Sequence, residues 1–305
     1  MEVVVTGGAG FIGSNLARSL AGAGHRVSVI DNLHTGDMEN LAGLDVEFRK
    51  ANAGDIGKLG ITRPQVIFHE GIYSSSPMYN ADRTLISKSV EDFVSLLEYA
   101  RKNDCEIVFA ATSSVYNGVA PPQGEEARIP VSDFYTEPRL MMERLGELYN
   151  KRHGLKVVGL RYFSVYGPNE RSKGKYANLV SQFLWDMMEG RPAVIYGDGT
   201  QKRDFTYVED VVDANLRAQK SDVRFGIYNV GTGRNYTLNA LVDILNERLG
   251  TRIPAQYVEN KIKGYVAETL ADTRKAKKEI GFGSKVSLSD GIAKLVEIEK
   301  AKKKK

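Results

Sequence analysis

Glycines are concentrated near the start of the chain, in the segment Gly7-Gly8-Ala9-Gly10-Phe11-Ile12-Gly13. A short apolar run, Val3–Val5, comes directly before this segment, and a helical pattern begins at Phe11. Glycines at such a turn let backbone N–H groups approach a pyrophosphate, and the N-terminus of the following helix adds the positive end of its dipole. The sequence therefore predicts a dinucleotide site with contacts from Gly7, Gly10, Phe11, Ile12 and Gly13.

An acidic residue stands at the end of the second apolar run. Asp31 follows Gly13 by 18 residues, close to the spacing at which a carboxylate accepts hydrogen bonds from the adenosine ribose. Such a carboxylate repels a 2′-phosphate, so the sequence favours NAD over NADP as the cofactor. Asp55 and Ile56, which follow the expected third strand, are predicted to contact the adenine end.

The elements needed to position these residues alternate between strand and helix patterns. Buried strands are predicted at Val3–Val5, Val27–Ile30, Val66–Phe68, Ile107–Ala111 and Val157–Leu160, and helices at Phe11–Ala23, Ala81–Lys102 and Phe134–Arg152. This alternation is typical of an α/β fold, a Rossmann-type doubly wound parallel sheet. Further helices are expected at Tyr176–Glu189, Leu238–Leu249 and Leu288–Glu299. We expect a dinucleotide-binding domain at 1–166 to which 204–230 return, a smaller mixed α/β substrate lobe at 167–203 and 231–299, and a lysine-rich tail at 300–305.

Charge and composition exclude several classes of protein. Five lysines lie in the last six of the 305 residues, and removing them from the net charge of +4 leaves about −1 for the body. The basicity is therefore that of a solvated tail, expected to fray, and gives little support to nucleic-acid binding. No apolar run approaches the roughly 18 residues of a membrane span, and the first residues belong to the fold rather than to a signal peptide.

Cysteine and histidine usage gives no sign of a metal site. Cys105 is the only cysteine, which excludes an intramolecular disulfide and a thiolate cluster and favours a cytoplasmic enzyme. His25, His34 and His153 share no metal-ligand spacing, and His69 at a strand end is interpreted as a packed, hydrogen-bonded residue.

Several segments, in order along nearly the whole chain, resemble one superfamily. The spacing Gly7-x-x-Gly10-x-x-Gly13 is similar to that of the extended short-chain dehydrogenases, specifically the nucleotide-sugar epimerase/dehydratase family. The segments that carry the resemblance, which is closest to UDP-glucose 4-epimerases, are Thr6–Ser14, Asp31–Gly36, Ala111–Tyr116, Leu160–Pro168, Gly197–Asp210, Ala271–Ala276 and Ile280–Phe282.

The resemblance implies a catalytic role for three residues. Thr112 matches the Ser/Thr that hydrogen-bonds the substrate 4-hydroxyl, and Tyr135 matches the tyrosine that removes its proton. Arg139 stands one helical turn after Tyr135, where a cation favours the phenolate form of the tyrosine and also approaches the cofactor. Hydride then passes from C4 of the sugar to NAD and returns on the other face.

The resemblance also implies binding roles for residues along the rest of the chain. Further cofactor contacts are expected from Asn32, Thr35, Gly36, Tyr162 and Phe163. Substrate contacts are expected from Ser113, Ser164, Asn178 and Leu179, from Tyr196 beside the uracil, and from Arg203 on the diphosphate, a task suited to a planar cation with several donors.

The chain departs from the family pattern at several sites. Arg139 replaces the usual lysine of Tyr-x-x-x-Lys, and Pro138 before it suits only the first turn of a helix, so the helix should begin close to Tyr135. Ser164 replaces the usual asparagine, and Glu70 stands where an apolar residue is usual. Ile262 occupies the place of a second diphosphate arginine.

Three functions remain open. The first is NAD-dependent epimerisation at C4 of a UDP-hexose, UDP-glucose/UDP-galactose, through a transient 4-keto sugar. The second is a dehydratase or decarboxylase of the same family, which Ser113 and Ser114 disfavour because dehydration needs an acid and a base there. The third is a non-catalytic, regulatory NAD-binding protein. The resemblance further implies a homodimer formed through the helices at 81–102 and 134–152.

Overall fold

The larger part of the molecule is built around a parallel sheet. The structure, a computed structural model, describes residues 1–261 and 265–303. The seven strands lie in the order β11-β6-β5-β4-β1-β2-β3, and all six neighbouring pairs are parallel. Their bounds are β1 Glu2–Thr6, β2 Arg26–Asp31, β3 Glu47–Lys50, β4 Val66–His69, β5 Glu106–Thr112, β6 Val157–Tyr162 and β11 Phe225–Val230. The predicted Rossmann-type sheet is confirmed.

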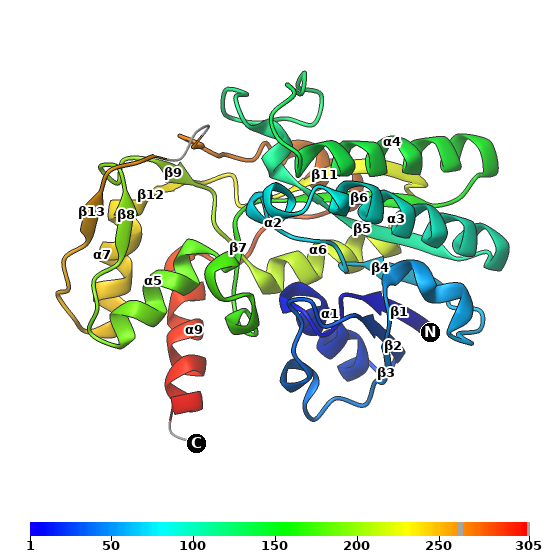
Figure 1. The fold of residues 1–305 in the computed structure, drawn as a ribbon, viewed down its shortest axis with the longest axis horizontal. Helices are drawn as coiled ribbons and strands as arrows, with labels where there is room; N and C mark the ends of the chain where they lie inside the picture. Colours follow the sequence, from blue (N-terminus) through cyan, green and yellow to red (C-terminus); the bar gives the residue numbers. More distant parts are fainter. Residues whose placement is uncertain (262–264, 304–305) are drawn as a thin grey trace.

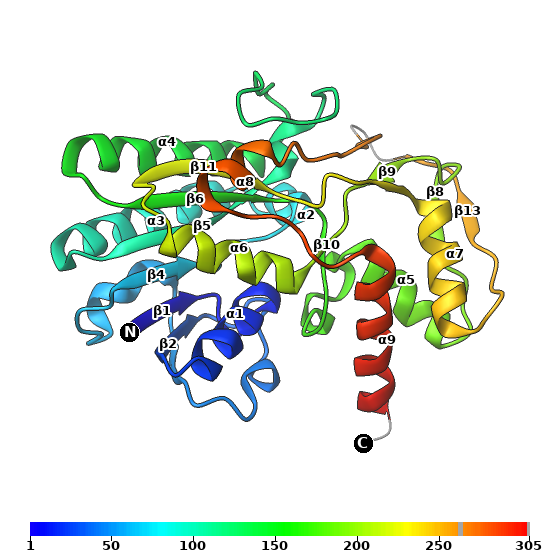
Figure 2. The same ribbon diagram turned by 180° about the vertical axis from the view of Figure 1, so that it is seen from behind.

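Helices cover both faces of this sheet (Figures 1 and 2). One face carries α1 (Phe11–Gly22) and α6 (Val208–Lys220), and the other carries α3 (Thr84–Asn103) and α4 (Thr136–His153). Because side chains alternate along a strand, Val3 and Val5 of β1 pack into the core on the α1 side and Val4 packs into the core on the α3 side. The chain from 208 to 230 therefore belongs to the sheet layers in space.

A smaller lobe has its own hydrophobic core. Helices α5 (Leu179–Met188), α7 (Leu238–Leu249) and α9 (Leu288–Lys303) pack together through residues such as Phe183, Leu241 and Leu295. Three short strand pairs complete this region: β7 Val165–Tyr166 with β10 Thr206–Tyr207, β8 Val194–Tyr196 with β13 Gln256–Val258, and β9 Lys202–Arg203 with β12 Tyr236–Thr237.

Some elements differ from the sequence expectations. The helix expected at Ala81–Lys102 is α3, which begins three residues later, and a separate short helix, α2 (Ser76–Ala81), precedes it. The stretch before α5 is a short 3₁₀ helix, η4 (Arg171–Tyr176). Helix α9 extends to Lys303, so the described part of the lysine-rich end continues this helix. The remaining short helices are η1 Met38–Leu41, η2 Ala53–Lys58, η3 Ser113–Tyr116 and α8 Arg274–Ile280. None of the helices within 1–261 and 265–303 has the length and apolarity to cross a bilayer.

Candidate active site

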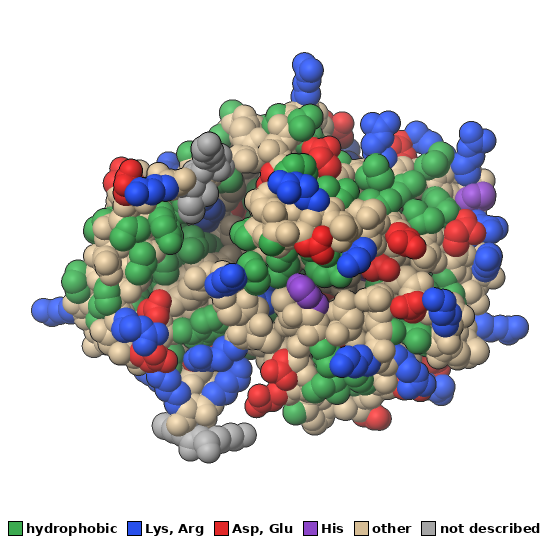
Figure 3. Space-filling model, in the orientation of Figure 1, with side chains coloured by type: hydrophobic (Ala, Val, Ile, Leu, Met, Phe, Trp, Pro, Cys, Tyr) green, Lys and Arg blue, Asp and Glu red, His purple; other side chains and the backbone are tan. Residues whose placement is uncertain are grey.

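A cleft runs across the carboxyl ends of the central strands, between the sheet and the smaller lobe. Figure 3 shows the surface hollowed there. The strands contribute in their spatial order: Asp31 from β2, the glycine turn after β1, Glu70 and Gly71 after β4, Thr112 from β5 and Tyr162 from β6. Ligands of open α/β sheets bind at this edge, so the cleft is the candidate active site.

The glycine turn is shaped by close approach of the backbone. Gly7 has φ +67°, and a Cβ there would lie 2.5 Å from Cα of Gly71. A Cβ on Gly13 would lie 2.2 Å from the carbonyl oxygen of Gly7. Gly10 is the N-cap of α1 and offers no side-chain cap, which leaves N–H groups at the helix start for an anion. Phe11, Ile12 and the three glycines all line the cleft, so this turn fits the pyrophosphate of a dinucleotide.

Asp31 joins the glycine turn to the loop that follows β2. Its carboxylate accepts hydrogen bonds from the backbone N–H groups of Ala9 (3.0 Å) and Leu33 (2.8 Å), which ties the glycine turn to the following loop. Burial raises the pKa of Asp31, while these donors act in the opposite direction. Further residues of the loop, Asn32, Thr35 and Gly36, also line the cleft.

The two residues expected at the adenine end, Asp55 and Ile56, are not part of the cleft lining. Asp55 lies outside the lining and pairs with Lys58 at 2.8 Å, and Ile56 is buried in the core beneath α3. The lining residues at this end are Ala51, Ala53 and Asp92 of α3. Asp92 accepts a hydrogen bond from the Gly54 N–H at 3.1 Å, and burial raises its pKa. No sequence motif marks Asp92, because it comes from a helix that the fold brings against η2.

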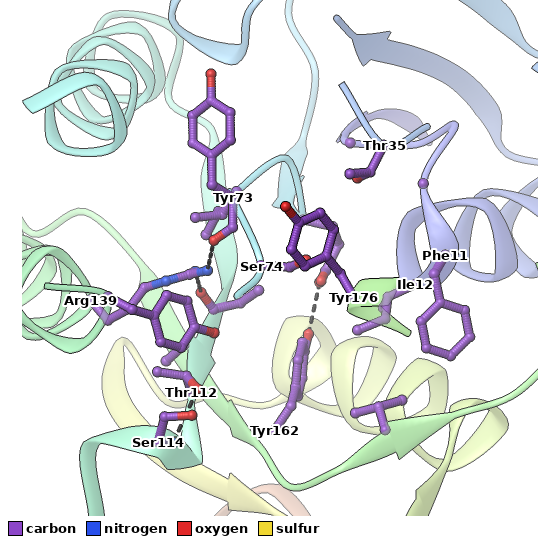
Figure 4. Close-up of a pocket in the computed structure, with 18 of the residues that line it drawn as sticks. Phe11, Ile12, Thr35, Tyr73, Ser74, Thr112, Ser114, Arg139, Tyr162 and Tyr176 are labelled. Atoms are coloured by element: carbon purple, nitrogen blue, oxygen red, sulfur yellow. Dashed lines mark hydrogen bonds between the residues drawn. The ribbon is translucent and has the colours of Figure 1, made fainter. Parts of the chain in front are cut away.

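Two residues with hydroxyl groups line the cleft, Thr112 at the end of β5 and Tyr135 at the start of α4. Thr112 is the N-cap of η3, and its Oγ1 accepts a hydrogen bond from the Ser114 N–H at 3.1 Å (Figure 4). Tyr135 is the N-cap of α4, fixed by a 2.9 Å hydrogen bond from its N–H to Asp133. The predicted helix start near Tyr135 is thereby confirmed. Thr112, Tyr135 and Ser113 all line the cleft.

Arg139 is a buried cation beside Tyr135. Its Nη1 donates to the Ala110 carbonyl at 3.0 Å and its Nη2 donates to the Tyr73 carbonyl at 2.9 Å (Figure 4). The guanidinium carbon lies 5.0 Å from the centre of the Tyr135 ring, within cation–π range. Arg139 therefore joins α4 to β5 and to the segment after β4, with its guanidinium against the tyrosine ring.

A hydrogen-bonded chain of three side chains lies under the end of β5. Asn215 of α6 donates to the Tyr162 hydroxyl at 2.8 Å, and that hydroxyl donates to Glu70 Oε1 at 2.7 Å. Tyr162, Glu70 and Ser164 line the cleft. Phe163 does not, because its side chain turns into a separate core with Val115.

The expected substrate residues are divided between the cleft and its surroundings. Arg203 lines the cleft, with its guanidinium carbon 5.3 Å from the ring centre of Tyr265, and burial lowers its pKa. Asn178, the N-cap of α5, also lines it. Leu179 packs on the core of the smaller lobe, and Tyr196 lies in a neighbouring shallow depression with 44% of its surface exposed. Ile262, at the place of the second arginine, falls outside the described residues.

Comparison with known proteins identifies the family. A family model described as the NAD dependent epimerase/dehydratase family matches residues 3–231. The chain belongs to this family. A putative UDP-glucose 4-epimerase of Methanocaldococcus jannaschii is 31% identical, with 96% of this chain and 97% of the relative covered. A UDP-glucuronate 4-epimerase of Thermodesulfobacterium geofontis is 30% identical, with 96% and 94% covered. The crystal structure of UDP-glucose 4-epimerase from Thermotoga maritima with UDP-glucose has a TM-score of 0.93 and 32% identity, with 99% of each chain covered.

Membership of the epimerase/dehydratase family confirms the resemblance found in the sequence and NAD as the cofactor. The residues present fit that cofactor, because the glycine turn and Asp31, the residue expected to bind the ribose, line the same cleft.

Several residues that line the cleft were not predicted from the sequence. Lys173 and Tyr176 of η4 line it, and the Lys173 ammonium lies 5.5 Å from the ring centre of Phe11 at the glycine turn. Tyr73 and Glu70 line it from the segment after β4. The only sequence signal was the acidic residue at position 70, where the family pattern is apolar.

Proposed function

We propose that this chain is a UDP-glucose 4-epimerase-like isomerase, which interconverts UDP-glucose and UDP-galactose through a transient 4-keto sugar. The observation that carries the proposal is the placement of Thr112 and Tyr135 on one cleft with the dinucleotide turn. The names of the Methanocaldococcus and Thermotoga proteins support a UDP-hexose as the substrate class.

Several residues that line the cleft have a proposed role in this mechanism. Tyr135 removes the proton of the sugar 4-hydroxyl, which Thr112 orients through a hydrogen bond. Two carbonyl groups hold the Arg139 cation against the Tyr135 ring, where we assign it the electrostatic role of the family's lysine. Bound NAD supplies the chemistry of accepting and returning a hydride. Arg203 and Asn178 hold the substrate diphosphate, and Ser113 and Ser164 contact the sugar.

The cleft also supports separate parts of the chain for cofactor binding and for substrate binding. We assign cofactor binding to residues 1–166 together with 204–230, and substrate binding to 167–203 and 231–299. Within the substrate part, Tyr196 and Leu179 lie outside the cleft lining, so we expect them to act at its margin, on the base end of the nucleotide. In the cofactor part, we expect Asp55 and Ile56 to act at the margin of the adenine end and Phe163 to act beside Tyr162 at the nicotinamide end.

Two side chains after Thr112 favour epimerisation over the family's other reactions. Ser113 and Ser114 both line the cleft, and neither can act as the carboxylic acid and base that loss of water requires. A dehydratase or decarboxylase of the same family remains the second candidate, since one relative is named as a UDP-glucuronic acid decarboxylase.

The assembly and location belong to the same proposal. Helices α3 and α4 lie side by side on the outer face of the sheet, where Met141 and Leu148 of α4 are about half exposed (51% and 47%). We expect a second copy of the chain to cover this face as a homodimer, and we expect the enzyme to work in the cytoplasm. Light scattering on the wild-type protein and on Met141→Glu tests the dimer, which the charge should weaken.

One assay separates the candidate functions. The protein is incubated with NAD and UDP-galactose, and the products are separated by anion-exchange chromatography; a parallel reaction contains UDP-glucuronate. Formation of UDP-glucose supports the proposal. Accumulation of a 4-keto sugar supports a dehydratase, release of CO₂ from UDP-glucuronate supports a decarboxylase, and no turnover of either substrate supports a non-catalytic protein.

A further inference from the structure

A buried carboxyl group lies between the cofactor turn and the catalytic hydroxyls. Glu70 follows β4, the strand that lies between β1, which leads into the glycine turn, and β5, which ends at Thr112. The register pairs Thr6 with His69, and the backbone N–H of Glu70 donates to the Thr6 carbonyl at 3.1 Å. A dinucleotide that reaches from the glycine turn toward Thr112 therefore has to pass the end of β4.

One oxygen of this carboxyl group has no partner. Glu70 Oε1 accepts the hydrogen bond from the Tyr162 hydroxyl, whereas Oε2 is buried from solvent and has no hydrogen-bond partner among the described residues. Glu70 nevertheless lines the cleft. Leaving a buried carboxylate oxygen unpaired is costly unless a ligand compensates it, so the geometry points to a group of the bound cofactor.

The charges that face Glu70 do not neutralise it by direct contact. Arg139 of α4 is the nearby cation, but its two terminal nitrogens are used by the Ala110 and Tyr73 carbonyls. Tyr162 of β6 faces Glu70 as a neutral donor. On β4 itself, burial lowers the pKa of His69 to about 3, so this histidine is uncharged and bonds Thr6 Oγ1. Burial raises the pKa of Glu70 to about 7.

We propose that Glu70 is a charge-selecting residue for the nicotinamide end of the cofactor, which favours the oxidised, cationic ring over the neutral reduced ring. A carboxylate near the ring attracts the positive charge of NAD⁺, whereas it has no such electrostatic attraction to the neutral ring of NADH. An epimerase that begins and ends each turnover with oxidised cofactor benefits from this preference, because the hydride is then returned to the sugar. The proposal depends on NAD binding alone and stands whichever substrate the enzyme uses.

Binding measurements on nucleotide-free protein test this role. The affinities for NAD⁺ (by calorimetry) and NADH (by its fluorescence) are compared between wild type, Glu70→Gln and Glu297→Gln. Glutamine keeps an acceptor for the Tyr162 hydroxyl but removes the charge, and Glu297→Gln makes the same change of net charge at an exposed site of α9. We expect the preference for NAD⁺ to fall about tenfold in Glu70→Gln, as for unit charges several ångström apart in a medium of moderate dielectric. The control should keep it.

A second measurement varies the pH. In the wild type, the preference for NAD⁺ should rise between about pH 6 and pH 8, as Glu70 loses its proton, and should be flat in Glu70→Gln. An unchanged ratio in Glu70→Gln, an equal loss of both affinities, or a wild-type ratio that does not depend on pH would each overturn the proposal.

Discussion

The guanidinium carbon of Arg139 lies 5.0 Å from the centre of the Tyr135 ring, while its two terminal nitrogens donate to the backbone carbonyls of Ala110 in β5 and Tyr73 in the segment after β4. Arg139 thus has an electrostatic and a structural task at once. Replacing it with methionine removes the cation and leaves two carbonyl groups without donors. We expect the variant to need a higher pH for activity than the wild type. We also expect its free energy of unfolding to fall by about 1–3 kcal/mol.

Arg139→Lys separates the two tasks. Lysine keeps the charge and one of the two hydrogen bonds, so the pH–rate profile should stay close to that of the wild type, even if thermal denaturation shows lower stability. If methionine leaves the pH profile untouched, the charge of Arg139 does not act on Tyr135.

Tyr135→Phe tests the proton transfer itself. The ring keeps its packing on Tyr79 and its contact with Arg139, and only the hydroxyl is lost. Turnover should fall by roughly two to four powers of ten, the usual contribution of a positioned acid–base group, while the affinity for the UDP-sugar changes little. Near-normal turnover would remove Tyr135 from the mechanism.

Asp31 should set the choice between NAD and NADP. Its carboxylate would face a 2′-phosphate, so Asp31→Ala should weaken NAD binding and relieve the bias against NADP. Because Asp31 also accepts the Ala9 and Leu33 N–H groups, Asp31→Asn is the matched variant: it keeps an acceptor and removes the charge. Calorimetric titration with both cofactors measures the effect, and tighter binding of NADP than of NAD by the wild type would contradict the assignment.

Arg203 should bind the substrate diphosphate. Arg203→Ala is expected to weaken UDP and UDP-sugar alike, by about 1.5–3 kcal/mol for a hydrogen bond to a charged group. Equilibrium binding of UDP measures this loss, with Lys202→Ala on the same short strand as the control. An unchanged affinity for UDP would show that the diphosphate lies elsewhere in the cleft.

Glu70 should make the cofactor-free protein less stable at alkaline pH. Its pKa in the fold, about 7, lies above its ordinary value of 4.5, so the folded state holds the proton more tightly than the unfolded state. The stability that the protonated Glu70 contributes to the folded protein is therefore fully present below about pH 4.5, and it is lost as the pH rises toward and through about 7. Glu70→Gln should raise the free energy of unfolding at pH 8 by up to about 3 kcal/mol, and by somewhat less than half as much at pH 5.5. Urea denaturation at both pH values checks this, and an equal effect at the two would contradict it.

The sheet and the cofactor turn could be predicted because their signals are local. Five apolar runs identified the central strands, and the glycines of the first turn require the close approaches that the structure shows at Gly7 and Gly13. The two remaining strands are the sheet edges, and their sequences lack a continuous apolar run: β3 is Glu-Phe-Arg-Lys and β11 contains Gly226 and Asn229. An edge strand has a neighbour on one side only, which relaxes the demand for apolar residues.

By itself, the sequence determined the fold class, the cofactor turn with Asp31, and the pairing of Tyr135 with a cation one helical turn later. These depend on backbone conformation and on spacing within one element. Only the tertiary structure decided which carbonyl groups Arg139 binds, that Asp92 replaces Asp55 in the cleft lining, and that Glu70, Tyr162 and Asn215 form one chain. The members of that chain come from the segment after β4, from β6 and from α6, and they lie up to 145 positions apart in the sequence. Their contact arises from the strand order and from the helix packed beneath the sheet, which no local pattern records.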